Sequence, residues 1–310
     1  MDILVTGGAG FVGSNLVDAL LENDFKVKAF DNLSTGRMEN LAGASKNKNF
    51  GFIKGDVRDF DAKILDGIDA VFHEAAQIDV RKSVSDPKYD LDVNVGGTIN
   101  LLESMRKYDV GKIVYASSGG AIYGNPQYLP CDEEHPTNPI SPYGASKLAA
   151  EKYIGIYHET YGIDYVNLRY GNVYGPRQDP LGEAGVIAIF LNKILNGQKP
   201  VIFGDGSQTR DYVHVYDVVA GNLLAMDKLN NGSFNVGCGS ETSVNRLVEI
   251  ISELTGGKIT PKHAEERKGE VQRICLDISR IKKVGFKPRY DLKEGMKTVL
   301  DWINNKNKQK

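Results

Sequence analysis

The feature that most constrains this chain is a glycine-rich turn close to its N-terminus. A short apolar run at residues 3–5 predicts a β-strand, and it leads into Thr6-Gly7-Gly8-Ala9-Gly10-Phe11-Val12-Gly13, with glycines at the spacing G-x-x-G-x-x-G. Residues 14–23 then read as a helix, and residues 26–30 as a second strand that ends at Asp31. Strand, glycine turn, helix, strand and acid, in this order, predict a βαβ unit that binds a dinucleotide.

Each residue of this unit has a physical reason to be there. Gly7 and Gly10 let the backbone turn tightly and approach a pyrophosphate, and Gly13 lets the helix pack close to the strand. The N-terminus of the helix supplies N–H donors and a partial positive charge for the phosphates. Asp31 stands where a carboxylate would accept hydrogen bonds from a ribose diol.

The alternation of strands and helices continues through the first half of the chain. Residues 50–53, 70–73, 112–116 and 165–170 read as strands, and residues 90–108 as a helix. We therefore expect an α/β fold with a Rossmann-type, doubly wound parallel sheet covered by helices on both faces. Ligands bind beyond the carboxyl ends of such strands, so one rim should gather the residues that follow them. These are Gly7, Asp31, Asp56, Ala75, Ser117 and Asn172.

The regular alternation of strands and helices becomes less clear after about residue 176. We expect residues 1–176 to form the dinucleotide-binding domain, with a later strand returning to it, and residues 177–310 to form a smaller, mixed α/β substrate-binding part that caps it. A glycine-bearing turn is expected at residues 182–185 and a charged loop at residues 267–270. Helices are expected at residues 186–195, 217–228, 244–255 and 292–303, followed by a frayed polar end.

A second chemical signal is the stretch Ser141-Pro142-Tyr143-Gly144-Ala145-Ser146-Lys147. Ser141 reads as an N-cap with proline in the first turn of a helix that runs to about Tyr161. Tyr143 and Lys147 then share one helix face. Where Tyr-x-x-x-Lys occurs alone, the tyrosine usually packs against other side chains and the lysine is usually solvated. Beside a dinucleotide-binding unit, however, a phenol next to a fixed ammonium predicts a proton-transferring group with a lowered pKa.

Composition excludes several classes of function. The formal net charge of −2 offers no basic field for nucleic acid or an anionic membrane, and no apolar stretch approaches the ~20 residues of a membrane span. The three cysteines lie far apart and in no C-x-x-C pair, which favours free thiols in the cytoplasm, and no signal peptide precedes the first strand. The five histidines form no ligand-spaced cluster, so no metal site is expected.

Taken together, these motifs resemble the extended short-chain dehydrogenase/reductase family over nearly the whole chain. The matching parts are the glycine turn, Asp31-Asn32, the Ser117-Ser118 strand end, the Tyr143/Lys147 pair and the stretch Arg169-Tyr170-x-Asn172-Val173-Tyr174-Gly175-Pro176-Arg177. Within the family the chain is most similar to the prokaryotic UDP-glucose 4-epimerase group, whose members have Gly-Gly-Ala-Ile/Val-Tyr-Gly after the serines.

The resemblance implies a mechanism and a cofactor. Tyr143 would be the acid/base at the sugar 4-hydroxyl, Lys147 would hold the nicotinamide ribose, and Ser117 or Ser118 would bond the same sugar oxygen. NAD would stay bound, take a hydride from C4 and return it to the other face of a 4-keto sugar. The expected cofactor contacts are Gly7, Gly10, Phe11, Val12, Gly13, Asp31, Asn32, Asp56, Val57, Ala75, Ala76, Gln77, Asn94, Tyr143, Lys147, Tyr170 and Val173.

The resemblance also implies a set of contacts to a UDP-sugar. Asn172 would contact a phosphate or the sugar, Arg210 and Arg267 would clamp the diphosphate, and Ile274 would border the substituent at C2 of the sugar, leaving room for N-acetyl sugars. Further substrate contacts are expected from Ser117, Tyr143, Val186, Val201, Phe203, Tyr212 and Glu270. A homodimer is implied too, through helices near residues 90–107 and 143–160.

One departure from the family pattern leaves a role open. Counting back from Tyr123-Gly124, the usual catalytic serine or threonine falls on Gly119, so Ser117 or Ser118 would have to serve; we prefer Ser117. The alternatives to an epimerase are a dehydratase, decarboxylase or reductase of the same family, or a non-catalytic NAD-dependent protein. The intact Tyr143/Lys147 pair argues against the last. Gly120 and Ala121 stand where a dehydratase carries an Asp-Glu pair, which argues against elimination.

Overall fold

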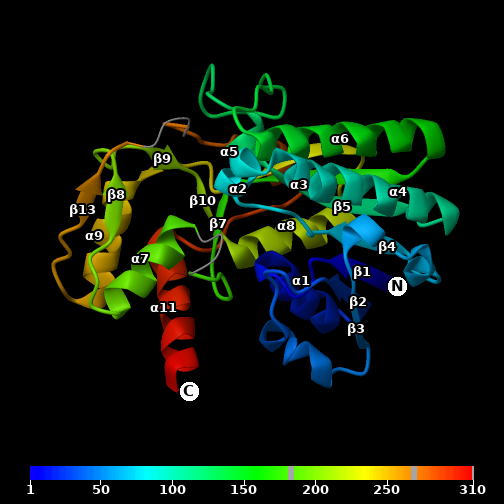
Figure 1. Cartoon of the computed structure of the whole chain (residues 1–310), viewed down its shortest axis with the longest axis horizontal. Coiled ribbons are helices and arrows are strands. Elements are labelled where there is room, and N and C mark those ends of the chain that lie inside the picture. The colour runs from blue at the N-terminus through cyan, green and yellow to red at the C-terminus, as the bar shows by residue number, and fades with distance from the viewer. Residues whose placement is uncertain (181–184, 267–270, 309–310) are drawn as a thin grey trace.

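A parallel sheet of seven strands forms the centre of the protein in the computed structural model, which describes residues 1–180, 185–266 and 271–308 (Figure 1). The strand order is β11-β6-β5-β4-β1-β2-β3. Without β11 this is the order 3-2-1-4-5-6 of dinucleotide-binding sheets, so the predicted fold class is confirmed. The strands are β1 (Asp2–Thr6), β2 (Lys26–Asp31), β3 (Phe50–Lys54), β4 (Ala70–His73), β5 (Lys112–Ser118), β6 (Asp164–Tyr170) and β11 (Gly232–Val236).

Helices cover both faces of the sheet because its strands are apolar on both sides. Ile3 and Val5 pack into one hydrophobic cluster with α1 (Phe11–Glu22) and α8 (Val215–Asp227). Leu4, which points the other way, packs into a second cluster with α4 (Gly97–Lys107) and α6 (Pro142–Tyr161). Shorter helices border this second layer and the strand ends: α2 (Val80–Ser85), α3 (Pro87–Leu91) and α5 (Gly119–Ile122).

The second half of the chain builds a smaller lobe with its own hydrophobic cluster. It lies at the left of Figure 1, beside the carboxyl ends of the central strands. Three two-stranded pairs belong to it: β7 (Asn172–Tyr174) with β10 (Tyr212–His214), β8 (Val201–Phe203) with β13 (Lys262–Ala264), and β9 (Thr209–Arg210) with β12 (Thr242–Ser243). The helices of this half, besides α8, are α7 (Val186–Leu195), α9 (Val244–Thr255), α10 (Ser279–Lys282) and α11 (Leu292–Lys308).

Several predicted helix boundaries differ from the structure. Helix α1 begins at Phe11, directly after Gly10, rather than at residue 14. The helix expected over residues 90–108 is interrupted by a wider turn at Asp92–Gly96, which separates α3 from α4. Helix α11 continues to Lys308, so residues 304–308 are not frayed; Lys306 lies over the Trp302 ring and pairs with Glu39 at 3.6 Å.

The remaining helical turns are single 3-10 turns at Met38–Leu41, Ala44–Lys46, Val57–Asp59 and Ala62–Leu65. Across the described ranges, no helix has both the length and the apolar character needed to cross a membrane.

Candidate functional site

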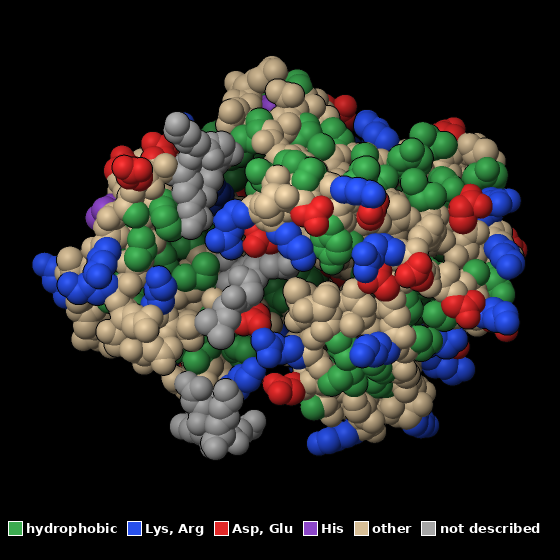
Figure 2. Space-filling model, viewed as in Figure 1, with side chains coloured by type: hydrophobic (Ala, Val, Ile, Leu, Met, Phe, Trp, Pro, Cys, Tyr) green, Lys and Arg blue, Asp and Glu red, His purple; other side chains and the backbone are tan. Residues whose placement is uncertain are grey.

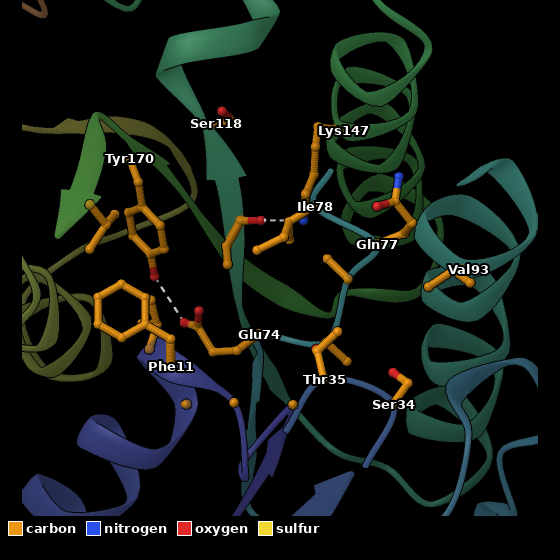
Figure 3. Close-up of a pocket in the computed structure, with 18 of the residues that line it drawn as sticks. Phe11, Ser34, Thr35, Glu74, Gln77, Ile78, Val93, Ser118, Lys147 and Tyr170 are labelled. Carbon is orange, nitrogen blue, oxygen red and sulfur yellow. Dashed lines mark hydrogen bonds between the residues drawn. The ribbon is translucent and has the colours of Figure 1, made fainter. Parts of the chain in front are cut away.

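A cavity of about 400 Å³ opens at the carboxyl ends of the central strands, as expected for this sheet order (Figure 3). Residues from the glycine turn, from five further strand ends and from α6 line it together. All but two of the expected cofactor contacts are among them: Gly7, Gly10, Phe11, Val12, Gly13, Asp31, Asn32, Val57, Ala75, Ala76, Gln77, Tyr143, Lys147, Tyr170 and Val173.

The glycine turn is packed too tightly for any side chain. Gly7 has φ +67°, and a Cβ there would lie 2.7 Å from the backbone nitrogen of Ala75. A Cβ on Gly13 would lie 2.2 Å from the Gly7 carbonyl oxygen. The turn therefore brings the first residues of α1, with their unpaired N–H groups, to the edge of the cavity.

Asp31 ends β2 inside the cavity and anchors the turn. Its carboxylate accepts hydrogen bonds from the backbone N–H groups of Ala9, at 3.0 Å, and Leu33, at 2.7 Å. Burial raises its pKa, while these hydrogen bonds act against the rise. Each carboxylate oxygen can accept a further hydrogen bond, and Asp31 lines the cavity, so a ribose diol could donate to it.

Asp56 is not among the residues that line the cavity, so its expected contact with the cofactor stays a prediction. Its carboxylate accepts hydrogen bonds from the guanidinium of Arg58, at 2.8 and 2.9 Å, and from Asn32. The hydrogen bonds from Arg58 hold its pKa below the usual range. Gly55 and Val57, on either side of it, provide the lining instead.

Asn94 is the second expected contact outside the lining. Its amide oxygen accepts from the backbone N–H of Gln77, and its amide nitrogen donates to the Gln77 carbonyl, both at 2.9 Å. Asn94 also donates to Asp90. Asn94 therefore holds the loop after β4 in place, and Gln77, which belongs to this loop, lines the cavity.

Tyr143 and Lys147 both line the cavity from the first turns of α6. Ser141 caps the helix, with its hydroxyl accepting from the N–H of Gly144 at 3.1 Å. The Lys147 ammonium is buried, donates to the Ala116 carbonyl at 2.8 Å and lies 4.8 Å from the centre of the Tyr115 ring. Burial lowers its pKa to about 8.

The two serines at the end of β5 have different surroundings. Ser117 is buried and donates to Oε1 of Glu151 at 2.5 Å, within the buried ion pair that Glu151 forms with Arg169. The Ser118 hydroxyl has no hydrogen bond among the residues that the structure describes. A Cβ built on Gly120 would lie 3.9 Å from the Ser118 hydroxyl and 3.5 Å from Oδ1 of Asn172, so these groups share one side of the loop.

Gly119 explains the departure from the family pattern. A Cβ at this position would lie 2.8 Å from Leu276 and 3.2 Å from the Arg169 carbonyl oxygen. A side chain here would point into the protein core rather than into the cavity. Any hydroxyl at the sugar must therefore come from a neighbouring residue.

The expected substrate contacts are only partly brought together. Ser117, Tyr143 and Asn172 line the main cavity, and Oδ1 of Asn172 is buried without a hydrogen-bond partner. Phe203 lines a second cavity of about 390 Å³ in the C-terminal lobe. Arg210, half-buried in β9, donates to the neighbouring Thr209 carbonyl and lines neither cavity.

Three other residues of that set pack in or around hydrophobic cores, and a fourth, Val201, lies in a strand of the C-terminal lobe. Ile274 is 1% exposed and packs in the cluster around the central sheet, so the structure does not place it at a sugar. Tyr212 is buried in the cluster of the C-terminal lobe, Val186 packs against that cluster, and Val201 lies in β8, paired with Lys262. Arg267 and Glu270, and residues 182–184 of the expected turn, lie outside the described residues.

Sequence reasoning missed two features of the site. Glu74 lines the cavity beside Ala75, and its carboxylate accepts from the Tyr170 hydroxyl at 2.9 Å. Arg169, quoted only as part of a motif, binds Glu151 at 2.8 Å and ties the end of β6 to α6. The signal for both was an ionisable residue at the end of a buried strand, where burial is costly unless a partner or a ligand compensates for it.

The residues present fit NAD. Asp31 suits a ribose diol, the side-chain-free turn and the start of α1 suit a diphosphate, and Lys147 with Tyr143 lies at the other end of the same cavity. Within the described part of the chain, no group of three or more His, Cys, Asp or Glu side chains is placed to hold a metal ion.

Comparisons with known proteins agree with this geometry. Residues 3–237 match the family model described as the NAD dependent epimerase/dehydratase family. The chain is 45% identical to the UDP-glucose 4-epimerase of Mycolicibacterium smegmatis, covering 99% of both chains. It is similar to the UDP-glucose 4-epimerase of Thermotoga maritima solved with UDP-glucose, with a TM-score of 0.94 and 44% identity over 99% of this chain and 100% of that one.

A second solved structure with a TM-score of 0.94 is the UDP-N-acetylglucosamine 4-epimerase of Methanobrevibacter ruminantium in complex with UDP-N-acetylmuramic acid. It is 40% identical, over 98% of each chain.

Proposed function

Because the chain belongs to the NAD-dependent epimerase/dehydratase family, we propose that it is an isomerase that interconverts UDP-glucose and UDP-galactose, or their N-acetyl forms. The observation that carries the proposal is that Tyr143 and Lys147 line the same cavity as the glycine turn. An acid/base and a dinucleotide site thus face one another across the space where a sugar would enter.

The residues of the site divide the work of a 4-epimerase. Bound NAD would supply reversible hydride acceptance at C4 of the sugar. Tyr143 would take the proton of the 4-hydroxyl and later return it, and the buried Lys147 ammonium would favour the phenolate that does so. Asn172, with its unpartnered buried oxygen, would accept a hydrogen bond from the substrate.

Of the two serines, we propose Ser118 as the hydroxyl at the sugar oxygen, in place of Ser117. Ser117 already donates its proton to Glu151, so it has none left for the sugar. Ser118 lines the cavity and lies on the same side of the loop as Asn172.

Elimination, as in a dehydratase, lacks its catalytic groups here. It needs a base at C5 and an acid at the C6 hydroxyl, and Gly120 and Ala121 cannot move protons. Without them the 4-keto sugar can only take its hydride back, and inversion then requires the sugar to turn over while the nucleotide stays bound.

The direct test is to incubate the purified protein with UDP-glucose and with dTDP-glucose and to follow the sugar protons by NMR. We expect interconversion at C4 without added cofactor and without net NADH. Tyr143→Phe, which removes one oxygen, should retain bound NAD and lose roughly 100-fold or more in turnover. A new 6-methyl signal with a persistent 4-keto product would instead identify a dehydratase.

We also propose that the protein is a homodimer that works in the cytoplasm. The three cysteines are free, as suits a reducing compartment. Exposed apolar side chains, among them Leu91 on α3 and Tyr153, Ile156 and Tyr161 on α6, lie on the layer of helices over one sheet face. Figure 2 shows hydrophobic side chains over the region that α4 and α6 occupy in Figure 1.

A further inference from the structure

Glu74 is an acid in the cofactor cavity that the proposed reaction does not use. It directly follows β4, is half-buried and lines the cavity beside Ala75 and Ala76. In Figure 3 its carboxylate reaches toward Tyr170, with Phe11 next to the pair. An ionisable side chain in such a place needs either a partner or a function.

A hydrogen-bonded chain fixes one oxygen of this carboxyl group. The amide nitrogen of Asn222 donates to the Val218 carbonyl at 3.0 Å and to the Tyr170 hydroxyl at 2.8 Å, and the first contact fixes the orientation of the amide. Because the Tyr170 oxygen accepts from Asn222, its proton is directed to Oε1 of Glu74, at 2.9 Å. Oε1 is thus held as an acceptor, and Oε2 is the atom that gains or loses a proton.

The charge of this carboxyl group changes near neutral pH. Burial raises the pKa of Glu74 to about 7, while the hydrogen bond from Tyr170 and the Lys147 ammonium act against the rise. Among the described residues, the titratable groups that face it are Tyr170 from β6 and Lys147 from α6, and Tyr143 lines the same cavity. Burial lowers the pKa of Lys147 to about 8.

The cofactor cavity can be oriented from its residues, and the charge of Glu74 acts on one end of it. Asp31 suits the adenosine ribose and the glycine turn the diphosphate, so the nicotinamide belongs at the end with Lys147 and Tyr143. The Glu74 carboxylate interacts electrostatically with the Lys147 ammonium at that end. A nicotinamide ring is cationic when oxidised and neutral when reduced, so a nearby carboxylate favours the oxidised form.

We propose that Glu74 sets the relative affinity of the site for NAD⁺ and NADH. The ionised carboxylate favours binding of NAD⁺, and protonation of Glu74 reduces this preference. By linkage, NAD⁺ binding then favours the ionised form of Glu74, and NADH binding favours the protonated form. The resting protein would in this way keep the oxidised cofactor with which the proposed reaction begins.

Competition between the two forms of the cofactor tests this proposal without any sugar. The full chain is equilibrated with equimolar NAD⁺ and NADH at pH 6 to 9, free nucleotide is removed, and the bound forms are quantified. We expect the ratio of bound NAD⁺ to bound NADH to rise about tenfold as the pH passes through ~7, which corresponds to a Glu74 pKa that differs by one unit between the two complexes. Loss of the Lys147 charge should add a second step near pH 8.

Glu74→Gln keeps the shape and an oxygen that accepts from Tyr170, but it stays neutral. It should leave a single step, that of Lys147, at a lower pH than in the unmodified chain, because the Glu74 charge raises the pKa of Lys147. It should also bind relatively more NADH at high pH. Asp132→Asn is the matched control, because Asp132 also accepts a tyrosine hydroxyl, that of Tyr128, at 2.9 Å, but lies outside the cavity. A profile of the Glu74→Gln variant that still shows two steps would overturn the proposal.

Tyr170→Phe provides an independent check in case Glu74→Gln fails to fold. Loss of the donated hydrogen bond should raise the pKa of Glu74 and move the lower step to higher pH. A step that stays in place would also overturn the proposal. Because the readout is cofactor binding alone, it holds whichever sugar the protein acts on, and a failed epimerase assay would not decide it.

Discussion

At the scale of single residues, two adjacent serines at the end of β5 have different roles. Side chains alternate along a strand, so Ser117 and Ser118 cannot both face the same layer. Ser117 joins Glu151 and Arg169 in a buried ion pair, whereas Ser118 lies on the side of Asn172.

Substituting each serine should therefore give different losses. Ser118→Ala should lower turnover with little change in stability. Ser117→Ala should leave a buried carboxylate short of one donor and lower the free energy of unfolding by about 1.5–3 kcal/mol, the range for a hydrogen bond to a charged group. Urea unfolding and initial rates on both variants separate the two effects; a larger turnover loss in Ser117→Ala would restore Ser117 as the hydroxyl at the sugar.

Asp31 should set the preference for NAD over NADP. Its carboxylate would repel a 2′-phosphate, and Arg37, the first cation after it in the sequence, already pairs with Asp179. Asp31→Ala should weaken NAD binding by about 1.5–3 kcal/mol, the value of a charge-assisted hydrogen bond. Calorimetry can measure this, with the exposed Asp59→Ala as control. Equal binding of NADP by the unmodified chain would contradict the expectation.

Lys147 should produce an alkaline limit to turnover. Its pKa is lowered to about 8 by burial, so it is charged below that pH and loses its charge as the pH rises through it. Because the ammonium favours the Tyr143 phenolate, turnover should decline above about pH 8. A pH profile of initial rates measures this decline. Lys152→Met, an exposed lysine farther along α6, should leave the profile unchanged, whereas a rate that rises steadily to pH 10 would exclude this role for Lys147.

At the scale of elements, α6 was predictable because local signals mark both its ends. Ser141 caps it, Pro142 occupies its first turn, and Gly162 ends it at φ +74°. This first turn also positions Tyr143, so the helix cap should matter for the reaction.

Ser141→Ala should cost about 1 kcal/mol of unfolding free energy, as is usual for a lost N-cap. Turnover should fall as well, since Tyr143 lies two residues into the helix, while NAD binding through Lys147, one turn further on, should persist. Thermal unfolding, initial rates and NAD titration on one variant test this. Ser45→Ala, in a 3-10 turn away from the cavity, is the control; unchanged turnover in Ser141→Ala would mean that Tyr143 is placed by packing alone.

What the sequence did not predict depends on contacts between distant segments. The strands of the central sheet up to residue 170, the glycine turn and the Tyr143/Lys147 pair follow from local patterns, and they were predicted. The wide turn at Asp92–Gly96, by contrast, contains Asn94, which bonds the backbone of Gln77 from another element. Ile274 looked like a pocket residue by counting along the chain, but tertiary packing places it in the core.

At the scale of the whole molecule, the uncovered apolar face of α6 should mediate dimerisation. Ile156 is 56% exposed there, and burying apolar helix faces can drive a stable four-helix contact. Ile156→Glu should give a monomeric mass in solution scattering at micromolar concentration. Leu195→Glu, 38% exposed on α7, should not. A monomeric mass for the unmodified chain would contradict the dimer.

The return of β11 to the central sheet makes the two halves of this protein poor building blocks for recombination. All five residues of β11 pair with β6, although α7, β8 and β10 of the C-terminal half lie between these two strands in the chain. A cut near residue 176 would leave β6 as a bare, aggregation-prone edge. Any chimera that exchanges substrate specificity between relatives must therefore retain the segment with α8 and β11 alongside the N-terminal half, and graft the sequence on either side of it as separate pieces.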